Sequence, residues 1–360
     1  MAGNKSLRTA ERTKEDEFYT QLTDIEKELR HYKQHFKGKT ILCNCDDPFE
    51  SNFFKYFVLN FNRLGLKKLL ATCYSGSPIA NQQLSIFDVL GTGEENTNKP
   101  YKAIVTQVYD QTGDGGVDML DVAELFKNGV NELVELTGDG DFRSEECIAL
   151  MDESDIVVTN PPFSLFREYV STLLEHNKHF IIIGSQNAIT YKEFFPLLMQ
   201  NKVWLGYGNG DMAFRVPEYF EPRETRFWVD EEGQKWRSMG NIAWYTNLDI
   251  RKRHEEMILV KKYSEEDYPK YDNIDAIEVS KVADIPLDYD GVMGVPITFM
   301  YKYNPEQFEI VNALNRYILF GCDELNEDIK ERHSHACNIN GKATYFRVLI
   351  KNKRPEEVKK

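Results

Sequence analysis

The chain has 360 residues, 41% of them hydrophobic and 28% charged, which fits a globular protein with one large and one smaller domain. No apolar run approaches the roughly 20 residues of a membrane helix, and the polar N-terminus lacks the apolar core of a secretion signal. The six cysteines include no CxxC pair, a pattern typical of reduced thiols. These features argue against membrane and secreted classes and predict a cytoplasmic protein.

The net charge of −14 is unevenly distributed along the chain. Residues 88–155 contain 17 acidic and 4 basic side chains, so the remainder is close to neutral. Basic clusters occur at 251–253, 261–262 and 342–360. Each of these clusters alone is more typical of a solvated surface. Nucleic acid nevertheless stays open as a partner, because a locally basic face can contact phosphates on an acidic protein.

Strands and helices alternate over the first 205 residues. Residues 1–14 are polar without an apolar period and are predicted to be a flexible arm. Apolar side chains at spacings of three and four then predict a helix over 22–36. In chain order, strands are predicted at 40–44, 68–73, 101–108, 132–136, 155–159, 179–184 and 203–205, and helices at 51–64, 118–126, 144–151, 165–174 and 191–199. This alternation predicts an α/β fold with a doubly wound, parallel, Rossmann-like sheet.

Two parts of the chain break this pattern. Residues 74–100 are rich in Ser, Gly, Asn and Pro and are predicted to form a long loop. After about residue 215, short strands, prolines and aromatic residues replace the regular alternation. The change places a domain boundary between 215 and 250, with a smaller C-terminal region beyond it.

The most informative motif is Asn160-Pro161-Pro162-Phe163, directly after the predicted strand 155–159. Ligands of open α/β sheets bind beyond the carboxyl ends of the strands, where this motif lies. The exocyclic amine of adenine is a poor nucleophile, because its lone pair is delocalised into the ring. The Asn160 side-chain oxygen and the Pro161 carbonyl are expected to accept its two N–H groups, in a turn that the prolines stiffen. Phe163 offers a face on which the base can stack.

Such a site needs no covalent nucleophile, because the amine nitrogen attacks a sulfonium methyl in line and positioning supplies much of the catalysis. The common alternative is a plain Asn-Pro turn after a buried strand. The place of the motif after an apolar strand in a doubly wound pattern favours the chemical interpretation.

With this motif, the sequence resembles the adenine-specific DNA methyltransferases of the EcoRI type, within the class I S-adenosylmethionine-dependent enzymes. The segments that carry the resemblance are DEFYT (16–20), ILCNCDDP (41–48), SNFFKYF (51–57), GDGDFRS (138–144), SDIVVTNPPFS (154–164), YPKYDN (268–273) and DIPLDYDGVMGVPITF (284–299). The resemblance covers most of residues 15–355. It implies a DNA adenine-N6 methyltransferase that flips its target base, at a cost of roughly a few kcal/mol. The target is expected to be a short palindrome, with GAATTC the first candidate.

The resemblance also implies roles for individual residues. It assigns S-adenosylmethionine binding to Phe18, Tyr19, Thr20, Asp46, Asp47, Pro48, Ser51, Asp139, Asp141, Phe142 and Asn160. Within this set, Asp141 would accept from the cofactor's adenine and Phe142 would form an apolar wall beside it. The first turn lacks the G-x-G of many class I enzymes, and strand 68–73 does not end in an acidic residue. Asp46 or Asp47 is therefore expected to contact the ribose. Phe214 would be a second stacking face for the target base, against the alternative of a core phenylalanine.

Double-stranded DNA is the implied partner, in a bacterial or phage host. The resemblance leaves open whether a cognate restriction endonuclease of the same system accompanies the enzyme. Residues 15–245 would form the catalytic domain and 246–360 the target-recognition region. The residues expected to contact DNA are Arg215, Arg223, Arg226, Arg237, Arg251, Lys252 and Arg253. A monomer is expected, because such an enzyme modifies one strand at a time.

Two other functions stay open on the residues alone. The same tetrapeptide would serve an N-methyltransferase that acts on RNA or on a protein amide, and a catalytically inactive DNA-binding relative would keep the fold. Cys322, His333, His335 and Cys337 match no common zinc spacing. No metal site is therefore predicted.

Overall fold

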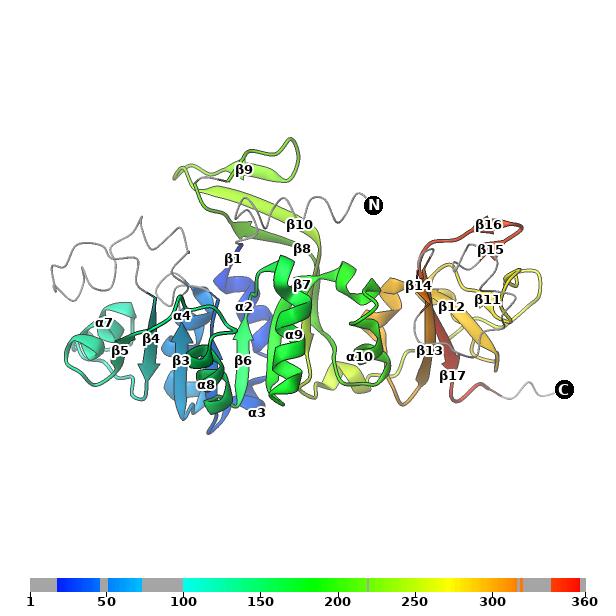
Figure 1. Cartoon of the computed structure of the whole chain (residues 1–360). Helices are drawn as coiled ribbons and strands as arrows, with labels where there is room; N and C mark the ends of the chain where they lie inside the picture. Colours follow the sequence, from blue (N-terminus) through cyan, green and yellow to red (C-terminus); the bar gives the residue numbers. More distant parts are fainter. Residues whose placement is uncertain are drawn as a thin grey trace. The chain divides into compact units, whose positions relative to one another are not determined.

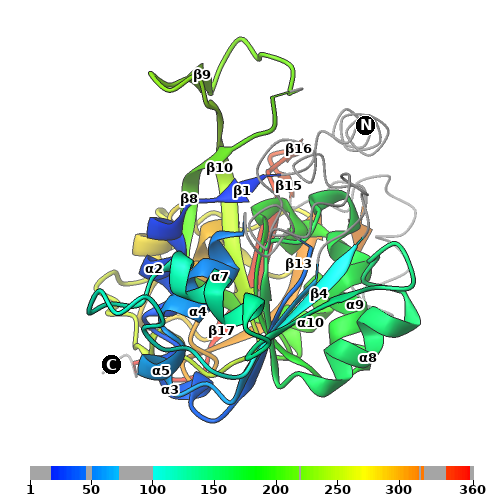
Figure 2. The same ribbon diagram turned by 90° about the vertical axis from the view of Figure 1, so that its left-hand side faces the viewer.

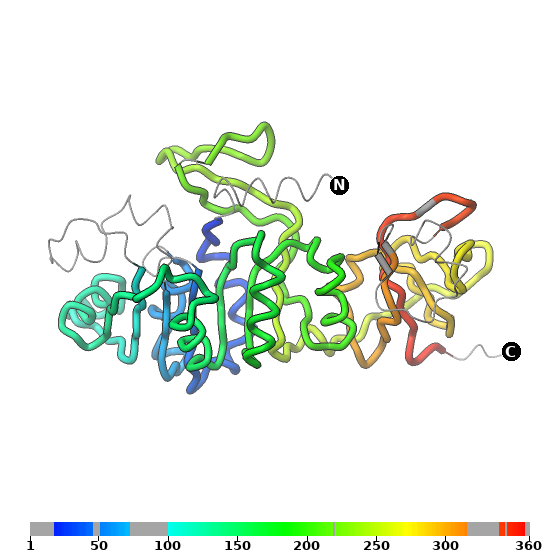
Figure 3. Tube along the Cα trace, viewed as in Figure 1, coloured from blue at the N-terminus to red at the C-terminus, as the bar shows by residue number. Residues whose placement is uncertain are grey.

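The computed structural model describes residues 18–45, 51–72, 100–218, 220–315, 318–319 and 338–356. The predicted arm, Asp46, Asp47, Pro48 and the segment 333–337 lie outside the described residues. Two compact units make up the chain: unit 1 is Met1–Ser185 with Gly208–Leu248, and unit 2 is Gln186–Tyr207 with Asp249–Lys360. The chain thus leaves unit 1 after Ser185 and returns at Gly208 (Figure 3). The functional division into 15–245 and 246–360 stays a prediction.

Ten strands of the described chain form one sheet, in the order β1-β8-β10-β7-β6-β2-β3-β4-β5 with β9 beside β10. Their bounds are β1 (Tyr19–Thr20), β2 (Thr40–Cys43), β3 (Lys68–Thr72), β4 (Tyr101–Val105), β5 (Glu132–Glu135), β6 (Ile156–Thr159), β7 (His179–Ser185), β8 (Trp204–Arg215), β9 (Phe227–Val229) and β10 (Lys235–Thr246). β7, β6, β2 and β3 are parallel, whereas β4, β5 and β10 join antiparallel. The predicted Rossmann-like α/β class is confirmed, with antiparallel strands at its flanks that the alternation did not indicate.

Helices cover both faces of this sheet (Figure 2). α2 (Leu22–Leu29), α3 (Lys33–Phe36), α4 (Asn52–Leu59) and α5 (Phe61–Leu64) lie on one face, and α8 (Glu145–Glu153) and α9 (Phe166–Glu175) on the other. α7 (Met119–Lys127) lies beside α4. β2 and β6 are buried along their whole length, as expected for parallel strands covered on both faces.

The predicted elements agree in kind with those observed, and the differences are local. The helix predicted over 22–36 is interrupted at residues 30–32 and forms α2 and α3. The helix predicted over 191–199 contains the short α10 (Phe195–Met199), preceded by a 3₁₀ segment, η3 (Gln186–Thr190). The strand predicted at 203–205 extends over twelve residues as β8. β8 and β10 carry β9 beyond the rest of the unit 1 sheet (Figure 1).

Unit 2 contains a separate five-stranded sheet with the order β11-β12-β17-β13-β14. Its strands are β11 (Ile277–Glu278), β12 (Val292–Pro296), β13 (Phe308–Asn315), β14 (Ile318–Leu319) and β17 (Arg347–Asn352), and β15 (Asn338–Ile339) pairs with β16 (Lys342–Ala343). Short 3₁₀ segments connect them, including η4 (Arg251–His254). Inside this unit, the buried Glu278 carboxylate accepts a hydrogen bond from Nη2 of Arg347 at 2.6 Å. No helix in the described part of the chain has both the length and the apolar character needed to cross a bilayer.

Candidate active site

The Asn160 turn begins where β6 ends, at the carboxyl edge of the parallel strands. Asn160 is only 6% exposed. Its Nδ2 donates to the Phe18 carbonyl at 2.6 Å, whereas its Oδ1 is buried and has no hydrogen-bond partner among the described residues. Beyond Pro161, the Pro162 carbonyl accepts the Leu165 amide at 3.0 Å and so fixes the course of the turn. One acceptor atom of a rigidly held amide is thus left without a partner in a buried position.

Two further buried polar atoms adjoin this turn without a partner in the described chain. They are Nδ2 of Asn44, which follows the neighbouring strand β2, and Oγ1 of Thr20 in β1. The Thr159 hydroxyl donates to the Asn44 carbonyl, and the Tyr169 hydroxyl donates to Asn44 Oδ1. A buried polar group without a partner costs roughly 1–3 kcal/mol. A polar ligand at this edge would remove that cost, so the residues fit a charged or amide-bearing group such as the methionine moiety of S-adenosylmethionine.

An aromatic cluster lies beside the turn. The Phe18 ring contacts Phe163 and Phe214, with centroid distances of 5.6 Å to each, and Phe220 at 6.2 Å. β1 holds Phe18 in place, because Thr20 pairs with Phe214 and Tyr19 with Arg215 of β8. Phe214 is fully buried. The structure therefore brings together Phe18, Phe163 and Phe214, with Phe18 against both of the predicted stacking faces.

The loop of Asp139, Asp141 and Phe142 has a different character. Arg143 donates three hydrogen bonds to the Asp141 carboxylate. Its backbone amide and its Nε donate to Oδ1 at 2.9 and 2.8 Å, and its Nη2 donates to Oδ2 at 2.6 Å. The Arg143 hydrogen bond holds the pKa of Asp141 below its usual value. Asp139 accepts the Asp141 amide and is exposed. Buried Phe142 packs edge-on against Tyr169 at 5.0 Å, which links this loop to Asn44.

The remaining predicted cofactor residues frame the same edge. Ser51 is buried directly before α4. The neighbouring Asn52 donates from Nδ2 to the Thr20 carbonyl at 2.7 Å. Asn52 thus ties α4 to β1, whose Tyr19 is buried under the Arg215 guanidinium at 5.3 Å.

The predicted DNA-contacting residues are divided between the two units. Arg215, Arg223, Arg226 and Arg237 belong to unit 1, and Arg251, Lys252 and Arg253 belong to η4 of unit 2. Burial and the nearby charges of Arg223 and Arg226 lower the pKa of Arg237.

In unit 2, the Lys252 ammonium donates to the Gly206 carbonyl at 2.8 Å. The Arg253 guanidinium lies 3.9 Å over the Trp204 ring and donates to Asn201. These two cations therefore make contacts that hold unit 2 together.

Comparison with known proteins identifies the family of the chain. Residues 6–353 match the family described as adenine-specific methyltransferase EcoRI. The chain belongs to this family. It is 47% identical to the type II methyltransferase M.EcoRI of Escherichia coli over 98% of both chains. It is 37% identical to M.MpnI of Mycoplasma pneumoniae and 36% identical to M.MgeORF184P of Mycoplasma genitalium, over 96% of this chain and 97–98% of theirs. No solved structure matches the chain.

The roles assigned to the Asn160 motif and to the other site residues stay predictions. Sequence reasoning missed Asn44, Tyr169 and Phe220. Asn44 had a usable signal, because it directly follows β2 at the edge where ligands bind. Tyr169 and Phe220 reach the site only through tertiary packing, which leaves no local pattern.

Proposed function

We propose that this protein is an S-adenosylmethionine-dependent DNA methyltransferase that methylates the N6 amine of adenine. The observation that carries the proposal is the buried Asn160 Oδ1, which lacks a partner in the described chain and stands beside the aromatic rings of Phe18 and Phe163. A buried acceptor beside aromatic rings suits a planar aromatic ligand that carries an amine, because the amine can donate to the acceptor while the ring stacks. The names of the family and of the relatives support the same chemistry.

Asn160 and Pro161 would act on the amine directly. The two N–H groups of the amine would donate hydrogen bonds to Asn160 Oδ1 and to the Pro161 carbonyl. These two bonds would draw the nitrogen lone pair out of conjugation with the ring. The fixed Nδ2 bond to the Phe18 carbonyl keeps the amide from rotating, so Oδ1 stays aimed at the incoming amine. Preorganised acceptors of this kind act most strongly where water is excluded.

S-adenosylmethionine, when bound, supplies an electrophilic sulfonium methyl. Its methyl group would pass from sulfur to N6 while Asn160 and Pro161 hold the amine, and the nitrogen would then lose one proton to water. Asn44, Thr20 and Phe142 are proposed to hold the cofactor. Asn44 Nδ2 would donate to a carboxylate, Thr20 Oγ1 would bond a polar group, and Asp141, already ionised by its contact with Arg143, would accept from an adenine amine.

Phe163 and Phe214 are proposed to face the target base. Because Phe18 contacts both rings, the base would enter only as the Phe18 ring shifts. Arg223, Arg226 and Arg237 would contact the phosphates of the strand from which the base is flipped. The proposed substrate is double-stranded DNA, and GAATTC is the first sequence to test.

The test is incubation of the purified protein with labelled S-adenosylmethionine and plasmid DNA, followed by mapping of modified bases by single-molecule sequencing. Asn160→Ala serves as the control. Methylated adenine at one short motif, lost in the variant, is expected. If the protein binds the cofactor but leaves the DNA unmethylated, DNA is not its substrate. Methyl transfer to RNA or to a protein amide would then be measured.

A further inference from the structure

We propose that Tyr169 is a positioning residue for the cofactor, which fixes the Asn44 amide so that its NH₂ group faces the carboxylate of S-adenosylmethionine. This role rests on the proposed function and deepens it, because it assigns the group of the cofactor that this edge of the sheet recognises. Asn44 directly follows β2 and is 3% exposed, and Tyr169 of α9 is fully buried.

The Asn44 side chain is held through its amide oxygen. Asn44 Oδ1 accepts a hydrogen bond from the Tyr169 hydroxyl and another from the Cys45 thiol, the latter at 3.6 Å. The backbone carbonyl of Asn44 accepts the Thr159 hydroxyl. Three donors thus fix the residue, whereas Asn44 Nδ2 is buried and has no partner in the described chain.

The direction of the amide follows from the donors around it. A hydroxyl and a thiol both offer a proton to Oδ1, and an amide rotated by 180° would meet these two donors with its own donor group. Burial raises the pKa of Tyr169 well above its usual value, so the hydroxyl keeps the proton that it donates. Tyr169 therefore makes Nδ2, a donor, the buried atom without a partner. A donor in this position suits an anionic group such as a carboxylate.

The backbone directly after Asn44 adds a separate observation. Cys45 has a φ of 79°, in the left-handed region that is unfavourable for a residue with a Cβ. Such a conformation persists only where its surroundings hold it, and it is frequent at ligand sites. The chain thus adopts an unfavourable turn at the edge where the cofactor is proposed to bind.

Tyr169 also contacts the other end of the proposed cofactor site. Phe142, which is proposed to lie beside the adenine of the cofactor, packs edge-on against the Tyr169 ring at 5.0 Å. The ring of Tyr169 therefore supports the residue proposed for the adenine, and its hydroxyl orients the residue proposed for the carboxylate.

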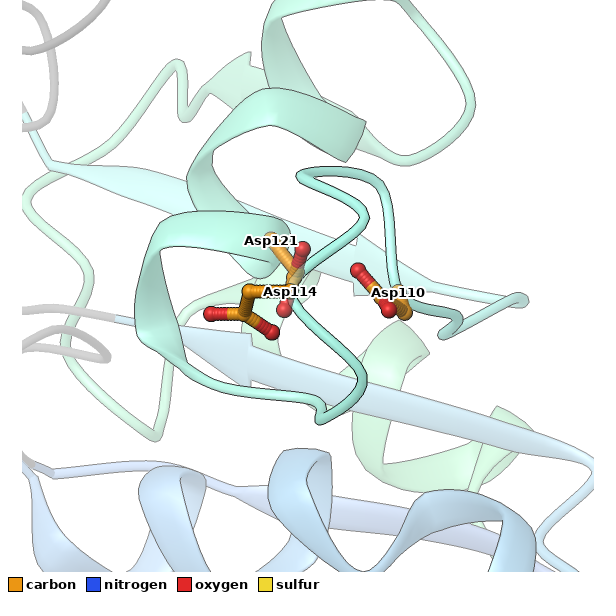
Figure 4. Close-up of side chains that lie close together, drawn as sticks. All are labelled: Asp110, Asp114 and Asp121. Carbon is orange, nitrogen blue, oxygen red and sulfur yellow. The ribbon is translucent and has the colours of Figure 1, made fainter.

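Another group of polar side chains in unit 1 shows the contrast with Asn44. Asp110, Asp114 and Asp121 lie close together before and within α7 (Figure 4), with one oxygen of each within 4.8 Å of the others. The Asp110 and Asp121 carboxylates accept backbone amides of the same segment. Their hydrogen-bonding capacity is used by the chain itself, whereas that of Asn44 Nδ2 is not.

The test measures the binding of S-adenosylmethionine and of decarboxylated S-adenosylmethionine to the full chain by calorimetry, without DNA. The two ligands differ only in the carboxylate, so the ratio of their Kd values reports how strongly this group is recognised. We expect Tyr169→Phe to weaken S-adenosylmethionine about tenfold, as for the loss of one hydrogen bond. The Kd of the decarboxylated ligand should not change. Tyr169→Phe combined with Asn44→Ala should bind no more weakly than Asn44→Ala alone, because Tyr169 acts through Asn44.

Tyr245→Phe is the matched control. Tyr245 is a fully buried tyrosine of unit 1, and its hydroxyl donates to the Ser185 carbonyl at 2.9 Å. This bond involves none of the residues proposed to hold the cofactor. Both Tyr→Phe variants are expected to lower the Tm by a similar amount, and only Tyr169→Phe should change the ratio of the two Kd values.

Asn44→Asp tests the direction of the amide with Tyr169 in place, and so serves even if Tyr169→Phe fails to fold. This variant puts an oxygen where the NH₂ group faces the carboxylate, and it should weaken S-adenosylmethionine more than Asn44→Ala does. Binding as tight as that of the unaltered protein would show that Oδ1 faces the cofactor, and would overturn the proposal.

The remaining outcomes separate this role from the proposed function. An unchanged ratio of Kd values in folded Tyr169→Phe, or an equal change in Tyr245→Phe, would overturn the role of Tyr169 and leave the methyltransferase proposal standing. If the unaltered protein does not bind S-adenosylmethionine at all, the proposed function is overturned, and the role of Tyr169 with it.

Discussion

Two neighbouring loops of unit 1 use their polar groups in opposite ways. At the Asn160 turn, Asn160 Oδ1, Asn44 Nδ2 and Thr20 Oγ1 are buried without partners among the described residues. In the loop after β5, Asp141 engages both carboxylate oxygens with Arg143, which also pairs with Glu168 at 3.2 Å. The fold thus leaves hydrogen-bonding capacity unused at one loop and nearly exhausts it at the other.

Folding alone does not account for the unused capacity, because buried polar atoms are normally bonded. Three of these atoms lie at the edge of β2 and β6, where we propose that the cofactor and the target base supply the partners. At the Asp141 loop, by contrast, Arg143 supplies most of the partners from within the chain. The cations of both units make contacts within their own unit. Arg226 pairs with Asp211 at 3.0 Å and Arg237 donates to the Thr225 carbonyl in unit 1, and Lys252 and Arg253 are engaged within unit 2.

The largest effect is expected for Asn160→Ala. Loss of one preorganised polar partner of a reacting group lowers the rate of transfer by about 10²–10³-fold. The folded state should lose only the Nδ2 hydrogen bond to the Phe18 carbonyl, about 1 kcal/mol, since the Oδ1 acceptor is not used within the described chain. Single-turnover methylation measures the first quantity, and chemical denaturation the second. A large loss of stability with a nearly normal rate would assign Asn160 to the scaffold.

Gly184→Ala should have the next largest effect, through the scaffold. A Cβ on Gly184 of β7 would lie 2.4 Å from the Phe166 ring, at the start of α9 just beyond the Asn160 turn. Overpacking of this kind costs roughly 1–3 kcal/mol. Thermal unfolding should therefore show a lower Tm, with activity reduced by displacement of the turn. An unchanged Tm would show that Phe166 moves aside freely.

Arg223→Gln and Arg253→Gln separate the two basic groups. Removal of a phosphate contact weakens DNA binding on all sequences and reduces the salt slope of log Kd by about 1. This result is expected for Arg223, which is exposed and lies 5.9 Å over the Phe220 ring. For Arg253, loss of the stacking on Trp204 should lower the stability of unit 2 and leave the salt slope unchanged. The opposite outcome would place the DNA on η4.

Asp141→Asn should give the smallest effect on stability, a lower Tm near neutral pH that disappears in acid. Arg143 lowers the pKa of Asp141 below its ordinary value of 3.8, so the ionised form is favoured in the folded state. This contribution is present above the unfolded pKa and is lost as the pH falls through the folded pKa. A partly exposed pair contributes at most about 1 kcal/mol. The Tm of the variant should thus depend less on pH below about pH 4, and parallel profiles for both proteins would contradict the pairing.

Local patterns in the sequence predicted the parts of the fold that local chemistry decides. β2, β6 and β7 are runs of apolar and β-branched residues, and the Asn160 motif sits in one tetrapeptide. The antiparallel flanks and the length of β8 were not predictable in this way. The middle of β8, from Gly206 to Asp211, is poor in strand-forming residues, and its extension depends on pairing with β1 and β10.

The site residues show the same difference between local patterns, which the sequence displays, and tertiary contacts, which it does not. Asn160 and Phe163 were found because they adjoin in sequence. Tyr169 reaches Asn44 across 125 residues, and only the parallel pairing of β2 with β6 makes the two meet. Similarly, the basic run 251–253 was visible in the sequence, whereas the proximity of Arg223, Arg226 and Arg237 arises from the fold around β9 and β10.

The central claim is that the Asn160 turn accepts the exocyclic amine of adenine. Mass spectrometry of nucleosides, after reaction of a GAATTC-containing duplex with S-adenosylmethionine carrying a deuterated methyl group, tests it most directly. The account predicts that the label appears in N6-methyladenine and disappears with Asn160→Ala. Label on another base, or label that persists in the variant, would contradict the assignment of this turn.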